Sequence, residues 1–164
     1  EPIILPEWNE HDGQKMGKYF IPKLIGVDPV MKKMATQLGP DESANKRVFL
    51  RIFHRLTELW SAGEIDTAEA GAESWASFQS RIQQGMEAVQ KAIEPNTKSV
   101  LITSGGSISV LMGEVLGLDV KKVLELSWIV RNTSISEFRI EEGNFKMRSF
   151  NEVGHLSPEQ ITYV

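Results

Sequence analysis

The stretch that most constrains this chain runs from residue 100 to residue 118 and reads VLITSGGSISVLMGEVLGL. Three aliphatic residues, typical of a buried strand, lead through Thr103 into Ser104-Gly105-Gly106 and then into an amphipathic helix. Glycines let backbone N–H groups approach a ligand closely, and the first turn of a helix adds unpaired N–H donors and the positive end of its dipole. The sequence therefore predicts a site for phosphate or a carboxylate at Ser104, Gly105 and Gly106, which we call the anion cradle. A tight turn with nothing bound fits the same residues.

Composition limits the classes of protein that remain. The chain has 164 residues, 41% hydrophobic and 24% charged, so we expect one domain over residues 1–164. A net charge of −4 and a pI near 5.5 disfavour a nucleic-acid or anionic-membrane surface, so a phosphate site has to be local. No apolar run reaches the ~20 residues of a membrane span and no signal-peptide pattern is present, which favours a cytoplasmic location. The lack of cysteine excludes disulfides and a cysteine nucleophile.

Apolar periodicity and turn residues predict helices before the cradle and a hairpin after it. Helices are predicted over 30–38, over 49–60 with Asp41 or Ser43 as cap, and from Ser74 to just before Glu94-Pro95-Asn96, with a loop over 61–72. A strand is predicted over Val100–Thr103. The hairpin consists of strands Ile135–Glu141 and Phe145–Phe150, joined at Glu142-Gly143-Asn144. A continuous apolar strand usually lies inside a parallel sheet covered on both faces, which needs neighbouring strands. Too few are present here, and the first residue is not Met, so we expect a further strand or two N-terminal to Glu1.

Five segments, taken in order, resemble the histidine phosphatase superfamily, which includes the phosphoglycerate mutases. They are Leu5-Pro6-Glu7, Gly71-Ala72-Glu73-Ser74 with Phe78 and Arg81, Thr103-Ser104-Gly105-Gly106, Asn132-Thr133-Ser134-Ile135, and Asn151 with His155-Leu156. The resemblance extends over nearly the whole chain. It implies an α/β fold of three layers (α/β/α) around a mostly parallel sheet, and a phosphatase or mutase that acts on a small phosphorylated substrate through a phosphohistidine, without metal or cofactor.

The chain departs from the family at two positions. The family's Arg-His-Gly motif supplies a nucleophilic histidine, but none of His11, His54 and His155 lies between Arg and Gly. The family's Ser-His-Gly-Gly is Thr-Ser-Gly-Gly here, so Ser104 replaces a second histidine and offers one neutral hydrogen bond instead of a cation. We therefore expect the nucleophile in the intact protein, on a segment that precedes this one.

Glu7 matches the family's general acid, which protonates the leaving oxygen and has to be kept protonated by partial burial or nearby negative charge. The family has a glycine four residues after this acid, where the present chain has His11, so Glu10 remains a second candidate. The residues expected to bind phosphate are Ser104, Gly105, Gly106 and, beside them, Thr103.

Other functions receive less support from the sequence. Metal binding is not expected, because no two histidines share ligand spacing. The alternative to a phosphatase or mutase is a non-catalytic phosphate-binding or regulatory module on a degenerate phosphatase fold. A third possibility is a domain that binds or isomerises a sugar phosphate, since Ser-Gly-Gly-Ser-Ile-Ser is rich in hydroxyl groups. The sequence leaves a monomer and a homodimer equally open.

Overall fold

The computed structural model describes residues 2–94 and 97–163, which form two packing units. One unit comprises Asp12–Phe78, and the other combines Glu1–His11 with Gln79–Val164. The long helix α4 (Trp75–Ala92) begins in the first and continues in the second. The single domain expected over residues 1–164 stays a prediction.

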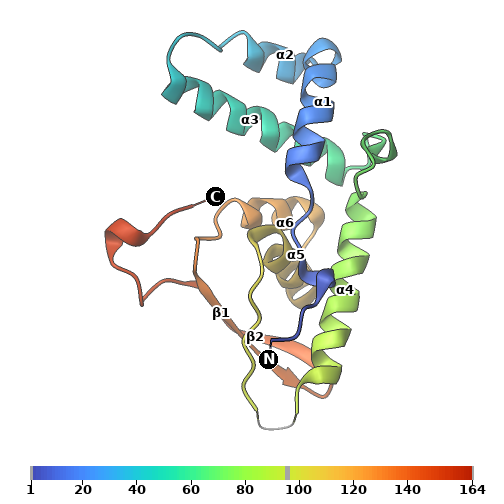
Figure 1. The fold of residues 1–164 in the computed structure, drawn as a ribbon, viewed down its shortest axis with the longest axis vertical. Helices are drawn as coiled ribbons and strands as arrows, with labels where there is room; N and C mark the ends of the chain where they lie inside the picture. The colour runs from blue at the N-terminus through green and yellow to red at the C-terminus, as the bar shows by residue number, and fades with distance from the viewer. Residues whose placement is uncertain (1, 95–96, 164) are drawn as a thin grey trace. The chain divides into compact units, whose positions relative to one another are not determined.

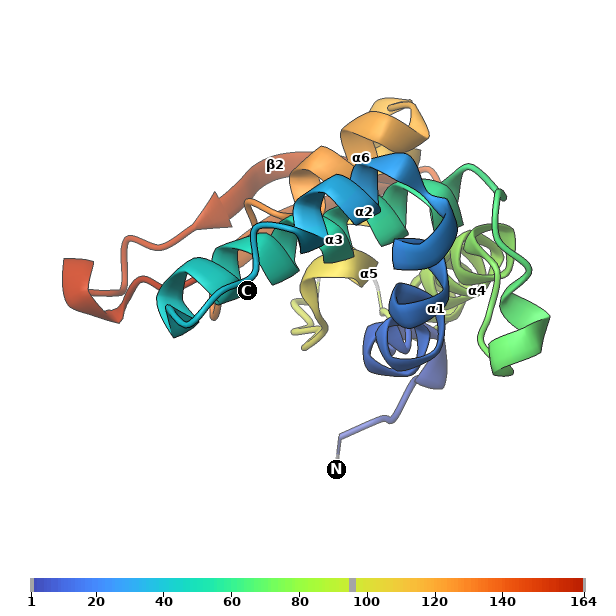
Figure 2. The same cartoon turned by 90° about the horizontal axis from the view of Figure 1, so that it is seen from above.

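The unit Asp12–Phe78 is helical. Its helices α1 (Gly13–Val27), α2 (Pro29–Ala35) and α3 (Glu42–Ser61) pack against one another, and a short 3-10 helix, η2 (Thr67–Ala70), follows (Figures 1 and 2). Each α-helix begins after an aspartate whose carboxylate accepts a hydrogen bond from an N–H of the first turn. These N-cap residues are Asp12 for α1, Asp28 for α2 and Asp41 for α3. Helix α3 confirms the helix predicted over 49–60 and Asp41 as its cap, whereas α1 was not predicted.

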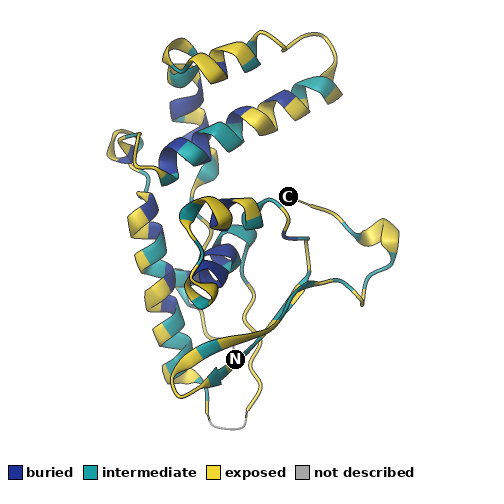
Figure 3. Ribbon diagram, turned by 180° about the vertical axis from the view of Figure 1, so that it is seen from behind, coloured by how far each residue is buried: buried dark blue, intermediate teal, exposed yellow. Residues whose placement is uncertain are grey.

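The second unit carries the predicted site. Its elements are the 3-10 helix η1 (Pro6–Trp8), most of α4, helices α5 (Gly105–Leu116) and α6 (Val120–Ser127), strands β1 (Ile135–Glu141) and β2 (Asn144–Glu152), and the 3-10 helix η3 (Pro158–Gln160). Helix α5 packs on α6 and is largely buried, as Figure 3 shows. Helix α4 confirms the third predicted helix and ends at Ala92, while the predicted breaker residues Pro95 and Asn96 lie outside the described residues. Among the described helices none is long and apolar enough to cross a membrane.

The predicted hairpin is confirmed. Strands β1 and β2 pair antiparallel with Glu141 opposite Asn144, which leaves Glu142 and Gly143 as a two-residue turn. Their φ angles are 51° and 74°. Two successive positive φ angles are typical of the type I′ turn, whose twist matches that of the flanking strands.

The predicted strand Val100–Thr103 is not present, which corrects the sequence analysis. The segment belongs to no strand and is unpaired, and Val100 and Ile102 are 90% and 92% exposed. The β1-β2 hairpin is the one sheet among residues 2–94 and 97–163, so this segment has no parallel neighbour there to pair its N–H and C=O groups. The mixture of helices and strands agrees with an α/β protein, whereas the described residues contain no three-layer parallel sheet.

Candidate functional site

The anion cradle lies at the first turn of α5. Ser104 is the N-cap residue, with extended backbone (φ −109°, ψ 172°), and Gly105 is the first helical residue. The Ser104 side chain makes no capping hydrogen bond, and its Oγ lies 3.5 Å from Ser107 Oγ. Helix α5 therefore begins without the local side-chain cap that α1, α2 and α3 have, and its first N–H groups need another acceptor.

Glu10, 96 residues earlier in the chain, supplies that acceptor. The Gly106 N–H donates to Glu10 Oε2 at 2.8 Å. A carboxylate is thereby held at the positive end of the α5 dipole. A larger residue at position 106 would displace the Glu10 carboxylate, because a Cβ there would overlap Glu10 Oε1 and lie 2.8 Å from Glu10 Cδ. The predicted cradle thus holds an anion, and that anion is a side chain of the same chain.

His11 is the second partner of the Glu10 carboxylate. The His11 backbone N–H donates to Glu10 Oε1 at 3.0 Å, and the ring Nδ1 lies 2.7 Å from the same oxygen. Partial burial raises the pKa of Glu10, but the hydrogen bonds and charge of His11 and the Gly106 N–H outweigh it and lower the pKa to about 2. Glu10 is therefore ionised at neutral pH in this arrangement.

Two hydroxyl groups, one from the first turn of α5 and one from the residue before its N-cap, hold the segment that leads to Glu10. Ser107, fully buried, has its Oγ 3.1 Å from both Trp8 O and Asn9 O. Thr103 Oγ1 donates to Trp8 O at 2.7 Å. The Thr103 hydroxyl is thus bonded to the backbone of residue 8, and its observed contact is with the protein chain.

Glu7 lies against α4. Its Oε2 is buried without a hydrogen-bond partner, and its Cβ lies 3.0 Å from the place that a Cβ on Gly85 would take. Among the described residues, Glu7 makes no hydrogen bond to Ser104, Gly105 or Gly106. The structure brings Glu10 to the cradle, and it places Glu7 on the α4 side of the same segment.

The last two segments of the resemblance lie near the hairpin. Asn151, with a φ of 59°, accepts the Arg131 N–H on its Oδ1 at 2.8 Å. Asn132 Nδ2 donates to Thr162 Oγ1 at 2.9 Å. His155 is exposed on the loop after β2. These contacts connect the end of the hairpin to its neighbours in the fold.

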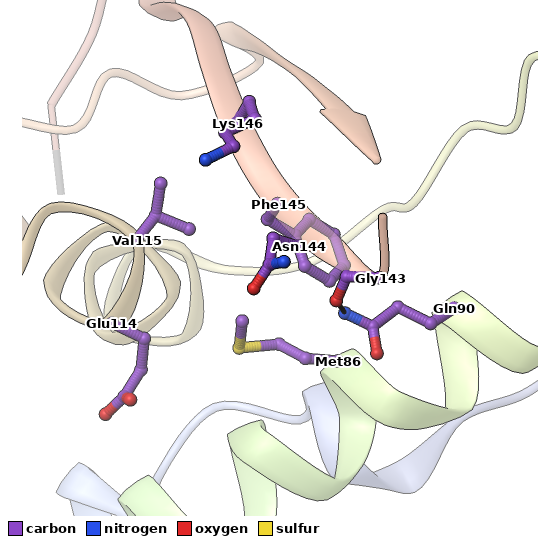
Figure 4. Close-up of a pocket in the computed structure, with 8 residues that line it drawn as sticks. All are labelled: Met86, Gln90, Glu114, Val115, Gly143, Asn144, Phe145 and Lys146. Atoms are coloured by element: carbon purple, nitrogen blue, oxygen red, sulfur yellow. Dashed lines mark hydrogen bonds between the residues drawn. The ribbon is translucent and has the colours of Figure 1, made fainter. Parts of the chain in front are cut away.

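A cavity of about 220 Å³ opens in the same unit, away from the cradle (Figure 4). It lies between Met86 and Gln90 of α4, the C-terminal half of α5 at Glu114, and the hairpin turn, where Gln90 Nε2 donates to Gly143 O at 2.8 Å. Glu114 follows Gly106 by eight residues, which is about 12 Å along a helix. The cavity contains none of the predicted phosphate-binding residues. Within residues 2–94 and 97–163 no group of three or more His, Asp or Glu side chains could hold a metal ion.

Two residues of the site were missed by the sequence analysis. His11 received no role there, although its position next to Glu10 was a usable signal. Ser107 was not singled out, although it follows Ser104 by one turn and therefore shares its helix face. Neither signal says which distant segment the two side chains meet.

Comparison with known families identifies the class of the chain. The model of the histidine phosphatase superfamily (branch 1) matches residues 36–153, well over half of the sequence. The chain belongs to this superfamily, which confirms the resemblance. The matched range includes Arg81 and Thr103–Gly106, whereas Glu7 and Glu10 precede it. No curated protein and no solved structure matches the chain significantly.

Proposed function

We propose that the anion cradle binds the phosphate group of a small phosphorylated substrate, in a phosphatase or mutase reaction that passes through a phosphohistidine in the intact protein. The observation that carries the proposal is the 2.8 Å hydrogen bond from the Gly106 N–H to the Glu10 carboxylate. This N–H, at the N-terminus of α5, binds a charged oxygen, and a phosphate oxygen accepts the same bond. Membership of the histidine phosphatase superfamily supports the phosphoryl chemistry.

Within this proposal Ser104 and the N–H groups of Gly105 and Gly106 contact the phosphate. The Ser104 hydroxyl has one long contact among the described residues, 3.5 Å to Ser107 Oγ, so its proton is available to a phosphate oxygen. Gly105 and Gly106 keep the approach to the backbone free of side-chain atoms of their own.

Glu10 is the better candidate for the general acid, because its carboxylate lies at the cradle. A phosphate dianion that takes the Gly106 N–H displaces the carboxylate and places negative charge beside it, and both changes raise the Glu10 pKa. A carboxyl group protonated in this way protonates the leaving oxygen. Glu7 stays a second candidate, supported by the buried and unpartnered Oε2.

The alternative function is a phosphate-binding module without catalysis. The observation that favours it is Ser104, which takes the place of the family's second histidine and offers one neutral hydrogen bond instead of a cation. The three-layer α/β/α arrangement with a mostly parallel sheet belongs to the catalytic proposal. It is supported by the apolar segment Val100–Ile102, whose exposed side chains and unpaired backbone suit a strand flanked by parallel neighbours.

Calorimetric titration of the chain with inorganic phosphate and with vanadate tests the cradle. Ser104→Ala removes one neutral hydrogen bond and should weaken binding about 2- to 10-fold at unchanged melting temperature. Glu10→Gln removes the competing charge and should tighten binding. Ser80→Ala, on the exposed face of α4, is the matched control and should change neither property. Equal affinities for all four proteins would refute the assignment of phosphate to this loop.

A second experiment distinguishes a catalyst from a binding module. The intact mass and N-terminal sequence of the natural protein are determined first, and its hydrolysis of p-nitrophenyl phosphate is then measured. Turnover together with an acid-labile phosphohistidine is the result that the catalytic proposal requires. Tight phosphate binding without turnover would favour the binding module.

A further inference from the structure

We propose that Arg81 is a positioning residue that holds the segment before Glu10 so that the Glu10 carboxylate reaches the Gly106 N–H. The role of Glu10 as acid rests on the proposed function. The contacts that Arg81 makes with this segment do not, because they are hydrogen bonds to backbone carbonyl groups and involve no substrate.

The Arg81 guanidinium donates to three carbonyl groups of the segment Pro6–Asn9. Its Nη1 lies 2.9 Å from Glu7 O and 2.8 Å from Asn9 O, with a longer contact of 3.4 Å to Pro6 O. Pro6 and Glu7 belong to the 3-10 helix η1, whose carbonyl groups point toward its C-terminal end, and Asn9 is the C-cap residue that follows with extended backbone. Asn9 directly precedes Glu10, so the guanidinium fixes the backbone one residue before the carboxylate.

The surface of α4 around Arg81 fits the same turn. Gly85 follows Arg81 by four residues and therefore lies on the same helix face. A Cβ on Gly85 would lie 2.7 Å from Trp8 Nε1, so the indole ring rests directly on the helix backbone. Arg81 thus holds the carbonyl end of the turn while Gly85 receives its buried tryptophan.

Accurate placement of the backbone matters because the glutamate side chain has three rotatable bonds and the bond it makes is short. The Gly106 N–H to Glu10 Oε2 distance is 2.8 Å, and a displacement of about 1 Å takes it beyond hydrogen-bonding range. Hydrogen bonds from a charged donor are roughly twice as strong as neutral ones, which suits Arg81 to this task better than an amide or a hydroxyl group.

The test is the titration of Glu10, followed by carbon-13 NMR of its carboxyl carbon in the wild-type chain and its variants. Arg81→Met keeps the aliphatic stem and removes the donor, so the Glu10 pKa should rise from about 2 by about one pH unit as the Gly106 bond is lost. Gly106→Ala breaks that bond directly and should give the same rise, and the double variant should give no further rise. The pairing with the adjacent His11 is local, so it persists in all of these proteins.

Two further variants separate positioning from general stability. Arg81→Lys keeps a charged donor and should leave the Glu10 pKa close to that of the wild type. Arg139→Met removes an exposed arginine that pairs with Glu141 at 3.0 Å on β1, and should leave the pKa unchanged.

An unchanged Glu10 pKa in folded Arg81→Met overturns the proposal. Should that variant not fold, Arg81→Gln carries the same test, because its shorter, uncharged side chain does not reach the carbonyl groups of Glu7 and Asn9, and an unchanged pKa there overturns the proposal equally. Phosphate titration of the wild type distinguishes the two proposals. A risen Glu10 pKa in Arg81→Met, with no phosphate bound by the wild type, supports the positioning role and refutes the proposed function.

Discussion

Replacing Glu10 by glutamine measures how much the Glu10 carboxylate stabilises the fold through its contacts with Gly106 and His11. The carboxylate accepts the Gly106 N–H at 2.8 Å and the His11 N–H at 3.0 Å, and it pairs with the His11 ring at 2.7 Å. Glutamine keeps the shape and one acceptor oxygen but loses the charge, and its amide N–H₂ faces donors. We therefore expect Glu10→Gln to be less stable than the wild type at neutral pH.

The size of the effect follows from the Glu10 pKa, which folding lowers from 4.5 to about 2. A pKa lowered by folding stabilises the native state at pH values above the unfolded pKa, and this stabilisation is lost as the pH falls from about 4.5 through about 2. The shift alone corresponds to about 3 kcal/mol. Because the Glu10 side chain is 37% exposed, solvent screening reduces the expected contribution to about 1–2 kcal/mol.

Urea unfolding of both proteins from pH 7 to pH 2.5, followed by circular dichroism, measures this difference. The wild type should be more stable by about 1–2 kcal/mol at pH 7, and the difference should narrow steadily below about pH 4.5. Glu87→Gln, at an exposed position on α4, is the control and should stay within about 0.5 kcal/mol of the wild type at pH 7. A wild-type advantage over Glu10→Gln that is the same at pH 7 and pH 2.5 would refute the reasoning.

Five substitutions test packing and capping by thermal or urea unfolding. Ile102→Ala, at a side chain that is 92% exposed, should lower the free energy of unfolding by less than about 0.5 kcal/mol. Ile82→Ala, at a fully buried side chain, should lower it by about 2–5 kcal/mol. Equal losses would mean that residue 102 is covered in solution. Gly85→Ala should cost about 1–3 kcal/mol because the new Cβ meets an indole ring, whereas Gly26→Ala, with open space around it, should stabilise by about 0.5–1 kcal/mol. Asp41→Ala removes the cap of α3 and should cost about 0.5–2 kcal/mol, and no loss would show that the cap is dispensable.

Local signals in the sequence were sufficient for elements whose stabilising groups lie within a few residues. Asp41 and the apolar spacing that follows it are adjacent in the chain, so α3 was predictable together with its cap. The hairpin was predictable for the same reason, because its turn is closed by Glu142 and Gly143. Helix α1 was missed because Pro22 interrupts its pattern and weakens the helical signal.

Features that depend on distant partners were not predictable in the same way. The segment Val100–Thr103 has the composition of a buried strand, yet a strand exists only when a neighbour pairs with it, and the sequence of the segment does not say whether one does. The cradle itself was predicted as an anion site from its glycines. That its bound anion is the Glu10 carboxylate depends on a contact across 96 residues, which no local pattern encodes.

The contact between Gly106 and Glu10 has a consequence for the proposed phosphate site. The Gly106 bond is one part of the interactions that lower the Glu10 pKa. If it contributes about 0.5–1 kcal/mol, a phosphate that displaces the carboxylate binds about 2- to 5-fold more weakly than it would to an empty cradle. The same displacement removes a hydrogen bond from the ionised carboxylate and brings a dianion near it, so the Glu10 pKa rises. Phosphate binding and protonation of Glu10 are then coupled, because the phosphate that displaces the Glu10 carboxylate also favours its protonated form.

This coupling predicts that phosphate binding takes up a proton. Calorimetric titrations in buffers of different ionisation enthalpy measure that uptake, which should be largest at mildly acidic pH, where the raised Glu10 pKa lies closest to the working pH. The uptake attributable to Glu10 should vanish in Glu10→Gln, which has no carboxylate to protonate. Wild-type and Glu10→Gln chains that bind phosphate with equal proton uptake would show that Glu10 stays ionised beside the guest, and the general acid would then have to be sought at Glu7.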